Sequence, residues 1–500
     1  MGGFELSIIG GYFLLILSVG WFKGRNEADV EDYFVGRRQV PWWAVLGSLV
    51  ATEVSAATYL AVPGVGFSEN MTYLQFGFGS FLARIFVATV FIGVFYQAKC
   101  LSIYEYLRAR FGGQTQYTAS LYFLLTRLLA SGVRLMIAVT GFSVILGIPF
   151  GWSLLIFGSV TLGYTFLGGI RSVIWTDCIQ AVVFISAGLA ASFWLLSRVG
   201  PTELWETAAA SGRWEMIRLV PGSRGLLAWL NDPQWLFTAM LFGFASTAAA
   251  LGTDQDMAQR LLASRTSSLA RRSLIVSGFI ALPVAALFLF LGVALHSYFQ
   301  VFPDPYFPTR FLDGVFVPDG DKAFSHFMTT GIPAWLRGLL LAGVLAAAMS
   351  SLDSAMAALS ASTVRDLLQP LVRRPLAPAR WLWISRGTTV IFAVLLMAMA
   401  WSLRGSGSFL WLAFKITSLT YGSLLGVFLL GRFSRRGSDR LNVIAMLCGT
   451  AVAVLGLWLI ESGRLPLAWT WLLLLGAGTT AIVGLLGPKS GKHPLSGHFS

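Results

Sequence analysis

Charged residues and cysteines are scarce in this sequence. Asp, Glu, Lys and Arg make up only 12% of the 500 residues, while 56% are hydrophobic and the mean hydropathy is +0.71. A soluble domain of this composition would expose far too much apolar surface, which excludes the soluble globular classes. The three cysteines, Cys100, Cys178 and Cys448, lie in or next to apolar runs, which argues against a disulfide framework.

Motifs of enzymes and of ATP-driven pumps are also missing. The sequence has no GxxxxGKS or GxxxxGKT phosphate-binding loop, which argues against direct use of ATP. Its four histidines form neither an HExxH motif nor another metal-ligand spacing. No catalytic set of a nucleophile, a base and an orienting residue is visible in the sequence. We therefore expect a protein that is not an enzyme.

Apolar runs long enough to cross a bilayer recur along the whole chain. We count about thirteen, which predicts an all-α polytopic membrane protein with about 13 transmembrane helices. The predicted spans are 5–22, 42–66, 71–98, 117–148, 151–169, 173–198, 235–258, 272–299, 336–362, 381–402, 408–431, 442–461 and 467–487.

The net charge of +13 comes from Lys and Arg residues that cluster in alternate loops. One set of loops holds about three times as many as the other, as the positive-inside rule describes. This predicts a cell (plasma) membrane protein with its N-terminus outside and its C-terminus in the cytoplasm. Because topology accounts for the charge, we expect no nucleic-acid partner. The long outer loops, 199–234 and 300–335, are expected to be short interfacial helices or plain connectors.

An acidic residue lies near the middle of the second predicted span. Glu53 is surrounded by small polar residues, and Pro63 and Gly64 follow it. A carboxylate at bilayer depth costs at least about 2.5 kcal/mol unless it faces a cavity, a cation or a partner. A break in the helix would place backbone carbonyls beside it, and such oxygen ligands suit a cation such as Na+. The segment therefore indicates coupled transport.

Other acidic residues at membrane depth each have a structural alternative. Asp177 opens the sixth span, where a helix dipole favours a negative charge. Asp353 lies among serines that suit close helix packing, and a neighbouring base could be its partner. The acidic stretch 252–256 ends the seventh span and could be a solvated helix end.

Three bases also lie inside apolar runs. Arg127 and Arg134 are seven residues apart, on one face of the fourth span, and Lys415 lies in the eleventh span. A base that faces a cavity would suit a carboxylate solute. The alternative for each base is an internal ion pair or a position near the end of a span.

Short segments spread over residues 5–435 resemble the sodium/solute symporter family, which includes carriers of sugars, proline, sialic acid, iodide and monocarboxylates. Each segment is a weak signal alone, but six in the right order are specific. They lie within 32–43, 48–64, 102–112, 168–180, 253–260 and 346–354.

The resemblance implies the inverted-repeat (LeuT-like) fold, with one N-terminal and two C-terminal extra helices around a 5+5 core. The polar-interrupted second and seventh spans support this, because such spans often open the two halves of a transporter. The expected regions are 1–41 with the first extra helix and a cytoplasmic loop, 42–198 as the first repeat, 199–234 as an extracellular loop, 235–431 as the second repeat, and 432–500 with the last helices and tail.

The resemblance also implies ion ligands. The main Na+ site would use the backbone carbonyls of Ala51, Val54 and Ala347 and the hydroxyls of Ser350 and Ser351, with Asp177 in support. A possible second Na+ site would use Asp353 and Ser354. Because relatives carry a hydroxyl at Asp353, its carboxylate could strengthen that site or make it proton-dependent.

Solute contacts carry over from the family less completely. The sugar carriers have an aromatic gate in the seventh span and a glutamine in the eleventh, where this chain has other residues. These departures, with the intramembrane bases, favour a small organic anion or monocarboxylate over a hexose. The solute-binding set is Glu53, Ser55, Thr58, Gln75, Arg134, Thr247, Ala250, Leu251, Phe414 and Lys415.

The function expected from this resemblance is Na+-coupled symport of a small organic solute by alternating access. A sugar, sialic acid or amino-acid symporter, or a proton-coupled variant, stays open as an alternative. A transporter-like sensor is disfavoured because the tail after the last span is short. The expected partners are the solute and the lipid bilayer, and the protein is expected to function as a monomer.

Overall fold

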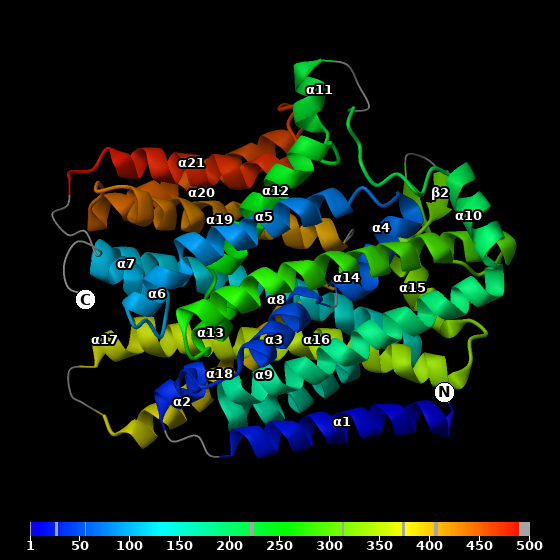
Figure 1. Cartoon of the computed structure of the whole chain (residues 1–500), viewed down its shortest axis with the longest axis horizontal. Helices are drawn as coiled ribbons and strands as arrows, with labels where there is room; N and C mark the ends of the chain where they lie inside the picture. The colour runs from blue at the N-terminus through cyan, green and yellow to red at the C-terminus, as the bar shows by residue number, and fades with distance from the viewer. Residues whose placement is uncertain are drawn as a thin grey trace.

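The computed structural model describes residues 2–25, 29–55, 57–220, 225–312, 315–372, 376–404 and 409–489. Helices dominate, and most run roughly parallel or antiparallel to one another in one bundle (Figure 1). α1 begins at one end of the bundle and α21 ends at the opposite end, which is the arrangement that an odd number of crossings requires. Which end faces the cytoplasm stays a prediction.

Eight helices in the described ranges are long and apolar enough to cross a membrane, and ten if each of two bent pairs counts as one span. The thirteen predicted runs fall on these eight helices, of which α9 holds two runs, on the two bent pairs, and on α19 and α21. The number of membrane crossings stays a prediction. The eight membrane-length helices, with their C-terminal extensions, are α1 (Gly3–Gly24), α5 (Leu74–Val90) with α6 (Ile92–Gln97), α8 (Gly113–Leu146), α9 (Phe150–Val199), α14 (Ser267–Val301), α16 (Ala334–Ser362) with η3 (Thr363–Leu368) and α17 (Gln369–Leu371), α18 (Pro378–Ser402) and α20 (Asp439–Glu461). Two further helices hold predicted runs, α19 (Phe409–Phe433) and the shorter α21 (Leu472–Leu485).

Gly169 divides the 50-residue helix α9 into the two predicted spans. Its φ of +43° and ψ of −147° are outside the helical region and are accessible to glycine at little steric cost. Close packing fixes the same region from outside, since a Cβ on Gly24 of α1 would lie 2.0 Å from the Cα of Gly168. Two adjacent glycines therefore provide both the kink and the contact with α1.

Two spans are broken, and both lie where the polar interruptions predict a break. α3 (Trp42–Glu53) gives way to η2 (Ala57–Ala61) and α4 (Val62–Ser68), with a 57° bend. α12 (Leu236–Gly252) is followed by α13 (Gln255–Leu262) at 60°. Both breaks lie near the start of an expected repeat, and the bounds of the repeats, 42–198 and 235–431, stay a prediction.

Helix α16 lies at the centre of the bundle. Of its most apolar 18-residue window, 94% is buried, and it packs on α9, α8, α1 and α18. Its stretch from Leu345 to Ser362 is rich in Ala and Ser, whose small side chains let neighbouring helices approach closely. α1 lies at one edge of the bundle and α20 and α21 at the other (Figure 1).

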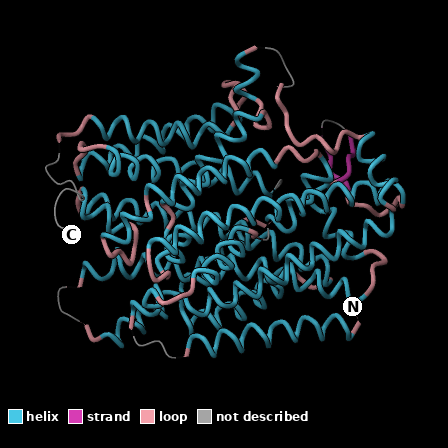
Figure 2. The backbone as a smooth tube through the Cα atoms, viewed as in Figure 1, coloured by secondary structure: helices cyan, strands magenta, loops and turns pink. Residues whose placement is uncertain are grey.

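Both long loops contain short elements at the end of the bundle where α1 begins (Figure 2). A two-stranded antiparallel hairpin pairs Thr309 with Pro318 and Leu312 with Val315. The remaining elements of the chain are α2 (Val30–Val35), η1 (Gly36–Arg38), α7 (Tyr104–Arg110), α10 (Pro201–Ala210), α11 (Leu226–Asn231), β1 (Thr309–Leu312), β2 (Val315–Pro318), α15 (Gly320–Thr329) and η4 (Trp469–Trp471).

Candidate ion and solute site

The broken end of α3 meets the serines of α16. Ser350 Oγ donates to the carbonyl of Ala51 at 3.1 Å and contacts the carbonyl of Ala347 at 3.2 Å, and Ser351 Oγ lies 3.3 Å from the same Ala347 oxygen. Val54 follows α3 with a non-helical ψ of 73°, and all five residues are buried. The last carbonyls of a helix have no donor further along it. Four of the expected ligands, the carbonyls of Ala51 and Ala347 and the hydroxyls of Ser350 and Ser351, therefore lie together, and Val54 follows at the break of α3. Na+ binding by this set stays a prediction.

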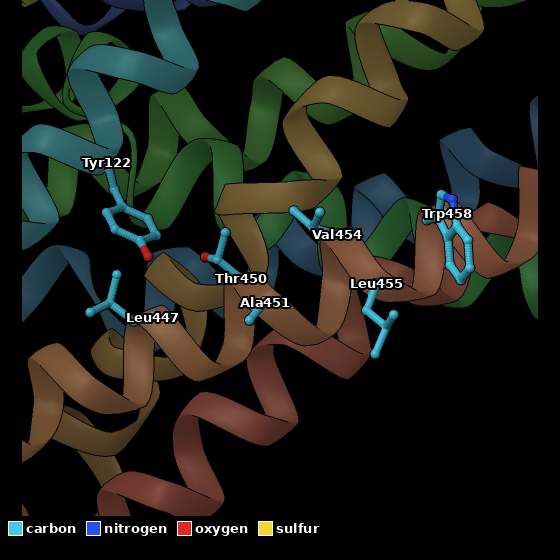
Figure 3. A pocket seen from close by; sticks show the side chains of 7 residues that line it. All are labelled: Tyr122, Leu447, Thr450, Ala451, Val454, Leu455 and Trp458. Carbon is cyan, nitrogen blue, oxygen red and sulfur yellow. The ribbon is translucent and has the colours of Figure 1, made fainter.

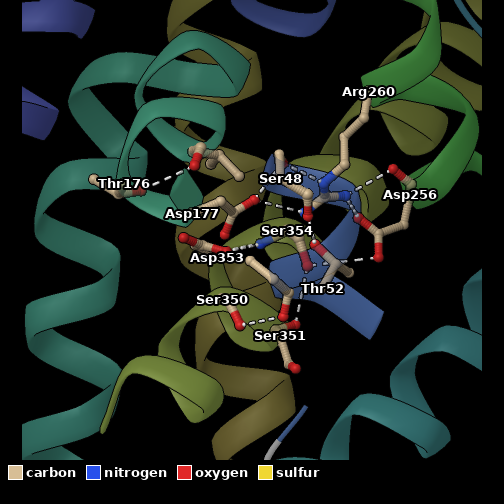
Figure 4. A network of polar contacts seen from close by, with 12 residues as sticks. Ser48, Thr52, Thr176, Asp177, Asp256, Arg260, Ser350, Ser351, Asp353 and Ser354 are labelled. Carbon is tan, nitrogen blue, oxygen red and sulfur yellow. Dashed lines mark hydrogen bonds and ion pairs between the residues drawn. The ribbon is translucent and has the colours of Figure 1, made fainter. Parts of the chain in front are cut away.

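Asp177 of α9 lies in an ion-pair network beside these oxygens (Figure 4). Its Oδ2 accepts from Ser48 at 2.5 Å and lies 3.3 Å from Nη2 of Arg260. Arg260 also pairs with Asp256, one turn earlier on α13. Asp177 is fully buried and its Oδ1 has no hydrogen-bond partner within the described residues. It is therefore more than a charge at a helix start.

The network continues through Arg127 toward the opposite side of the core. Arg127 of α8 forms an ion pair with Asp256 and lies 3.6 Å from Asp254, and Tyr421 of α19 donates to Asp254. Asp254 and Asp256 are 0% and 1% exposed, so 252–256 is not a solvated helix end. Arg127 makes the internal ion pair that the sequence left as its alternative.

Asp353 is held by donors rather than by a base. Its carboxylate accepts from the hydroxyl of Tyr164 at 2.7 Å and from the backbone N–H of Ser354 at 2.5 Å. The hydroxyl of Ser354 lies 3.5 Å from Asp256, which links this residue to the network. The ion pair that we considered for Asp353 is absent from the described residues.

The buried network has more negative than positive groups. It holds the carboxyls of Asp177, Asp254, Asp256 and Asp353 but only the guanidinium groups of Arg127 and Arg260. An uncompensated charge in a protein interior is costly, so two more positive charges are needed, as bound cations or as protons. This excess fits cation binding next to Ser350 and Ser351.

A cavity of about 210 Å³ adjoins the network and the break in α3. At about 30 Å³ per water molecule it has room for about seven waters, which suits a small solute. Of the expected solute-binding residues, those that line it are Glu53, Ser55, Thr58, Arg134, Thr247, Ala250 and Leu251.

Glu53 is paired inside this cavity with a base that sequence reasoning overlooked. Arg84 of α5 forms an ion pair with the Glu53 carboxylate. Thr247 donates to Ser80 at 2.8 Å, and Ser80 accepts from Arg84 at 2.6 Å. The criterion that singled out Arg127, a base within an apolar run, would also have found Arg84.

Three expected solute contacts lie elsewhere or cannot be placed. Gln75 donates to the carbonyl of Gln234 at 2.8 Å, which ties it to the long loop before α12, and it does not line the cavity. Lys415 pairs with Glu461 at 2.6 Å, away from the cavity lining. The side chain of Phe414 lies outside the described residues. Solute contact stays a prediction for all three.

A second hollow of about 600 Å³ lies between α20 and Tyr122 of α8 (Figure 3). Its lining is mostly apolar, and α20 exposes large side chains such as Leu455 and Trp458 along this face. No charged residue lines it. This hollow belongs to the outer face of the bundle and offers no groups for an ion.

Comparisons with known proteins find relatives along most of this chain. A "Putative sodium-dependent multivitamin transporter" of Drosophila melanogaster is 28% identical, over 88% of this chain and 72% of its own length. The "Sodium/sialic acid symporter SiaT" of Proteus mirabilis (strain HI4320) is 25% identical, over 91% of this chain and 89% of its own.

The fold agrees with a solved structure as well. A substrate-bound, outward-open Na+-coupled sialic acid symporter matches with a TM-score of 0.84 at 22% identity, and covers 97% of each chain. The model of the sodium:solute symporter family matches residues 33–449. The chain is thus a multi-pass membrane transporter and not an enzyme, and it belongs to the sodium:solute symporter family.

Proposed function

We propose that this protein is a Na+-coupled symporter that imports a small organic solute carrying a carboxylate. The observation that carries the solute class is Arg134. Its side chain lines the cavity, its Nη1 is buried without a partner, and no hydrogen bond or ion pair joins it to another residue in the described ranges. A carboxylate is the bidentate partner that suits a guanidinium group.

The ion assignment rests on the meeting of α3 and α16. Na+ would bind the carbonyls of Ala51, Val54 and Ala347 and the hydroxyls of Ser350 and Ser351. Bound Na+ would connect the broken helix to the centre of the bundle and order the wall that Ser55 and Thr58 present to the cavity. An inside-negative potential of 100 mV adds about 2.3 kcal/mol per charge moved.

A carboxylated sugar such as sialic acid would also present a carboxylate to Arg134. The relative from Proteus mirabilis is named for this solute and aligns along most of this chain. Asp353 and Ser354 would form a second Na+ site or a proton site, because the network lacks two positive charges. Sugar or amino-acid symport and proton coupling are the alternatives to be tested.

Uptake into proteoliposomes, with Na+ and H+ gradients imposed separately, tests the coupling. We expect the Na+ gradient to drive accumulation at equal pH on both sides; accumulation with the H+ gradient alone would contradict the assignment. A thermal-shift screen of candidate solutes, with and without Na+, tests which class of solute binds. Small carboxylates should stabilise the protein more strongly when Na+ is present, by mass action on the native state.

We also propose that the monomer is functional and that the N-terminus faces outside. Cysteine labelling at Gly2 and Lys489 in intact cells tests the orientation. A membrane-impermeant reagent should label the first position only.

A further inference from the structure

Glu53 and Arg84 form an ion pair in the wall of the cavity. Three arginines line the cavity, but they differ in what they already bind. Arg127 is paired with Asp254 and Asp256. Only Arg134 has no partner in the described parts of the chain.

The guanidinium of Arg84 is held on every side. Its Nε donates to Ser277 at 3.2 Å, its Nη1 donates to the carbonyl and hydroxyl of Ser80, and its Nη2 pairs with Glu53. The Arg84 side chain is only 4% exposed. Glu53 therefore occupies the one charge-bearing contact through which Arg84 would bind an anion.

Among the described residues the cavity consequently presents one unpartnered guanidinium, that of Arg134. Glu53 holds Arg84, and Asp254 and Asp256 hold Arg127. A solute with one carboxylate would pair with Arg134. A dicarboxylate would place its second negative group in a cavity with no remaining free cation, and like charges at low dielectric repel strongly.

We propose that Glu53 makes the site selective for singly charged carboxylates by occupying Arg84, and that without it Arg84 becomes a second anion subsite. The proposal rests on the proposed function, since it assumes that a carboxylate binds at Arg134. It assigns to Glu53 an exclusion role that does not require contact with the bound solute.

The test compares a monocarboxylate with a dicarboxylate of similar length, propionate and succinate. Both are measured by Na+-dependent binding to the purified full-length protein, in wild type and in Glu53→Gln. We expect the ratio of succinate to propionate affinity to rise about ten- to hundredfold in the variant, as for one added charge-assisted hydrogen-bonded contact. An unchanged ratio in a folded variant overturns the proposal.

Two further variants keep the test decisive. Glu53→Asp retains the negative charge and should retain the wild-type preference. Glu53→Gln combined with Arg84→Gln removes both charges, so its ratio should return toward the wild-type value even if the single variant fails to fold. A double variant that prefers succinate would show that Arg84 is not the second subsite. If neither propionate nor any other carboxylate of the thermal-shift screen binds wild type, the proposed function is contradicted instead.

Discussion

Ser350 of α16 donates a hydrogen bond of 3.1 Å to the carbonyl of Ala51, the residue two positions before the end of α3. These residues are 299 positions apart in the sequence. The contact joins the most buried helix of the bundle to a helix that breaks in mid-membrane.

Replacing both Ser350 and Ser351 with Ala should raise the Na+ concentration for half-maximal uptake by at least about tenfold. Two hydroxyl ligands disappear, while the cavity lining remains. The order of preference among solutes should stay the same. Ser360→Ala is the matched control, because Ser360 is buried on the same helix but donates to Ser385 at 2.8 Å. Unchanged Na+ dependence in the double variant would rule out this ion site.

Asp177→Asn should weaken Na+ dependence and lower stability together. Arg260 would lose one of its two carboxylate partners, and a hydrogen bond to a charged group contributes about 1.5–3 kcal/mol. Asp366→Asn is the comparison, since Asp366 is equally buried but accepts from Ser102 at 2.7 Å and Gln116 at 2.8 Å. We expect both variants to melt earlier, and only Asp177→Asn to change the Na+ titration. Equal Na+ titrations of Asp177→Asn and Asp366→Asn would contradict a role for Asp177 near the ion.

Arg134→Gln should weaken carboxylate binding about ten- to hundredfold, because the only unpaired guanidinium among the described cavity-lining residues is lost. Arg134→Lys should retain part of the affinity, since an ammonium keeps the charge without the bidentate geometry. Isothermal titration in the presence of Na+ measures both. Lys322→Gln serves as a control, because Lys322 is exposed and pairs with Asp319 at 2.9 Å in an outer segment. If Arg134→Gln binds the carboxylate with wild-type affinity, the solute binds at another site.

Asp304 should make the outer loops sensitive to acid. The backbone N–H of Tyr306 and the ring of His326 both hydrogen-bond its carboxylate, which lowers the pKa of Asp304 below its usual range. A lowered carboxyl pKa stabilises the fold above the unfolded-state pKa, and this stabilisation is lost as pH falls through the folded-state value. Wild type should therefore melt above Asp304→Asn at pH 7, and the difference should shrink as pH falls below about 4 and disappear once the folded-state carboxyl is protonated. If the difference in melting temperature does not depend on pH, the charge of Asp304 does not contribute to stability.

Membrane-spanning helices and their breaks followed from composition and local order alone. Helical backbone satisfies its own polar groups, so any long apolar run in a bilayer has one stable conformation. Polar residues in such runs are costly, and this marked Glu53, Asp177 and Asp353 before any contact was known. The same argument marked Arg127 and Arg134, and only Arg134 was placed in the expected solute-binding set.

Partners from distant parts of the chain decided the role of each polar group. Arg127 meets Asp256 of α13, which lies 129 residues away, while Arg134, two turns further along α8, meets no such carboxylate in the described residues. Glu53 became half of an ion pair because α5 places Arg84 beside it. Gln75 donates to the carbonyl of Gln234 and Lys415 pairs with Glu461, both away from the cavity lining.

The sequence by itself determined the apolar spans, the two interrupted helices and the family, because each depends on the local pattern of residues or on their order. Only the tertiary structure decided which charges cancel and which stay free to bind a solute. Electrostatic attraction at low dielectric depends on the few ångströms between two groups, and packing of helices far apart in the chain sets that distance.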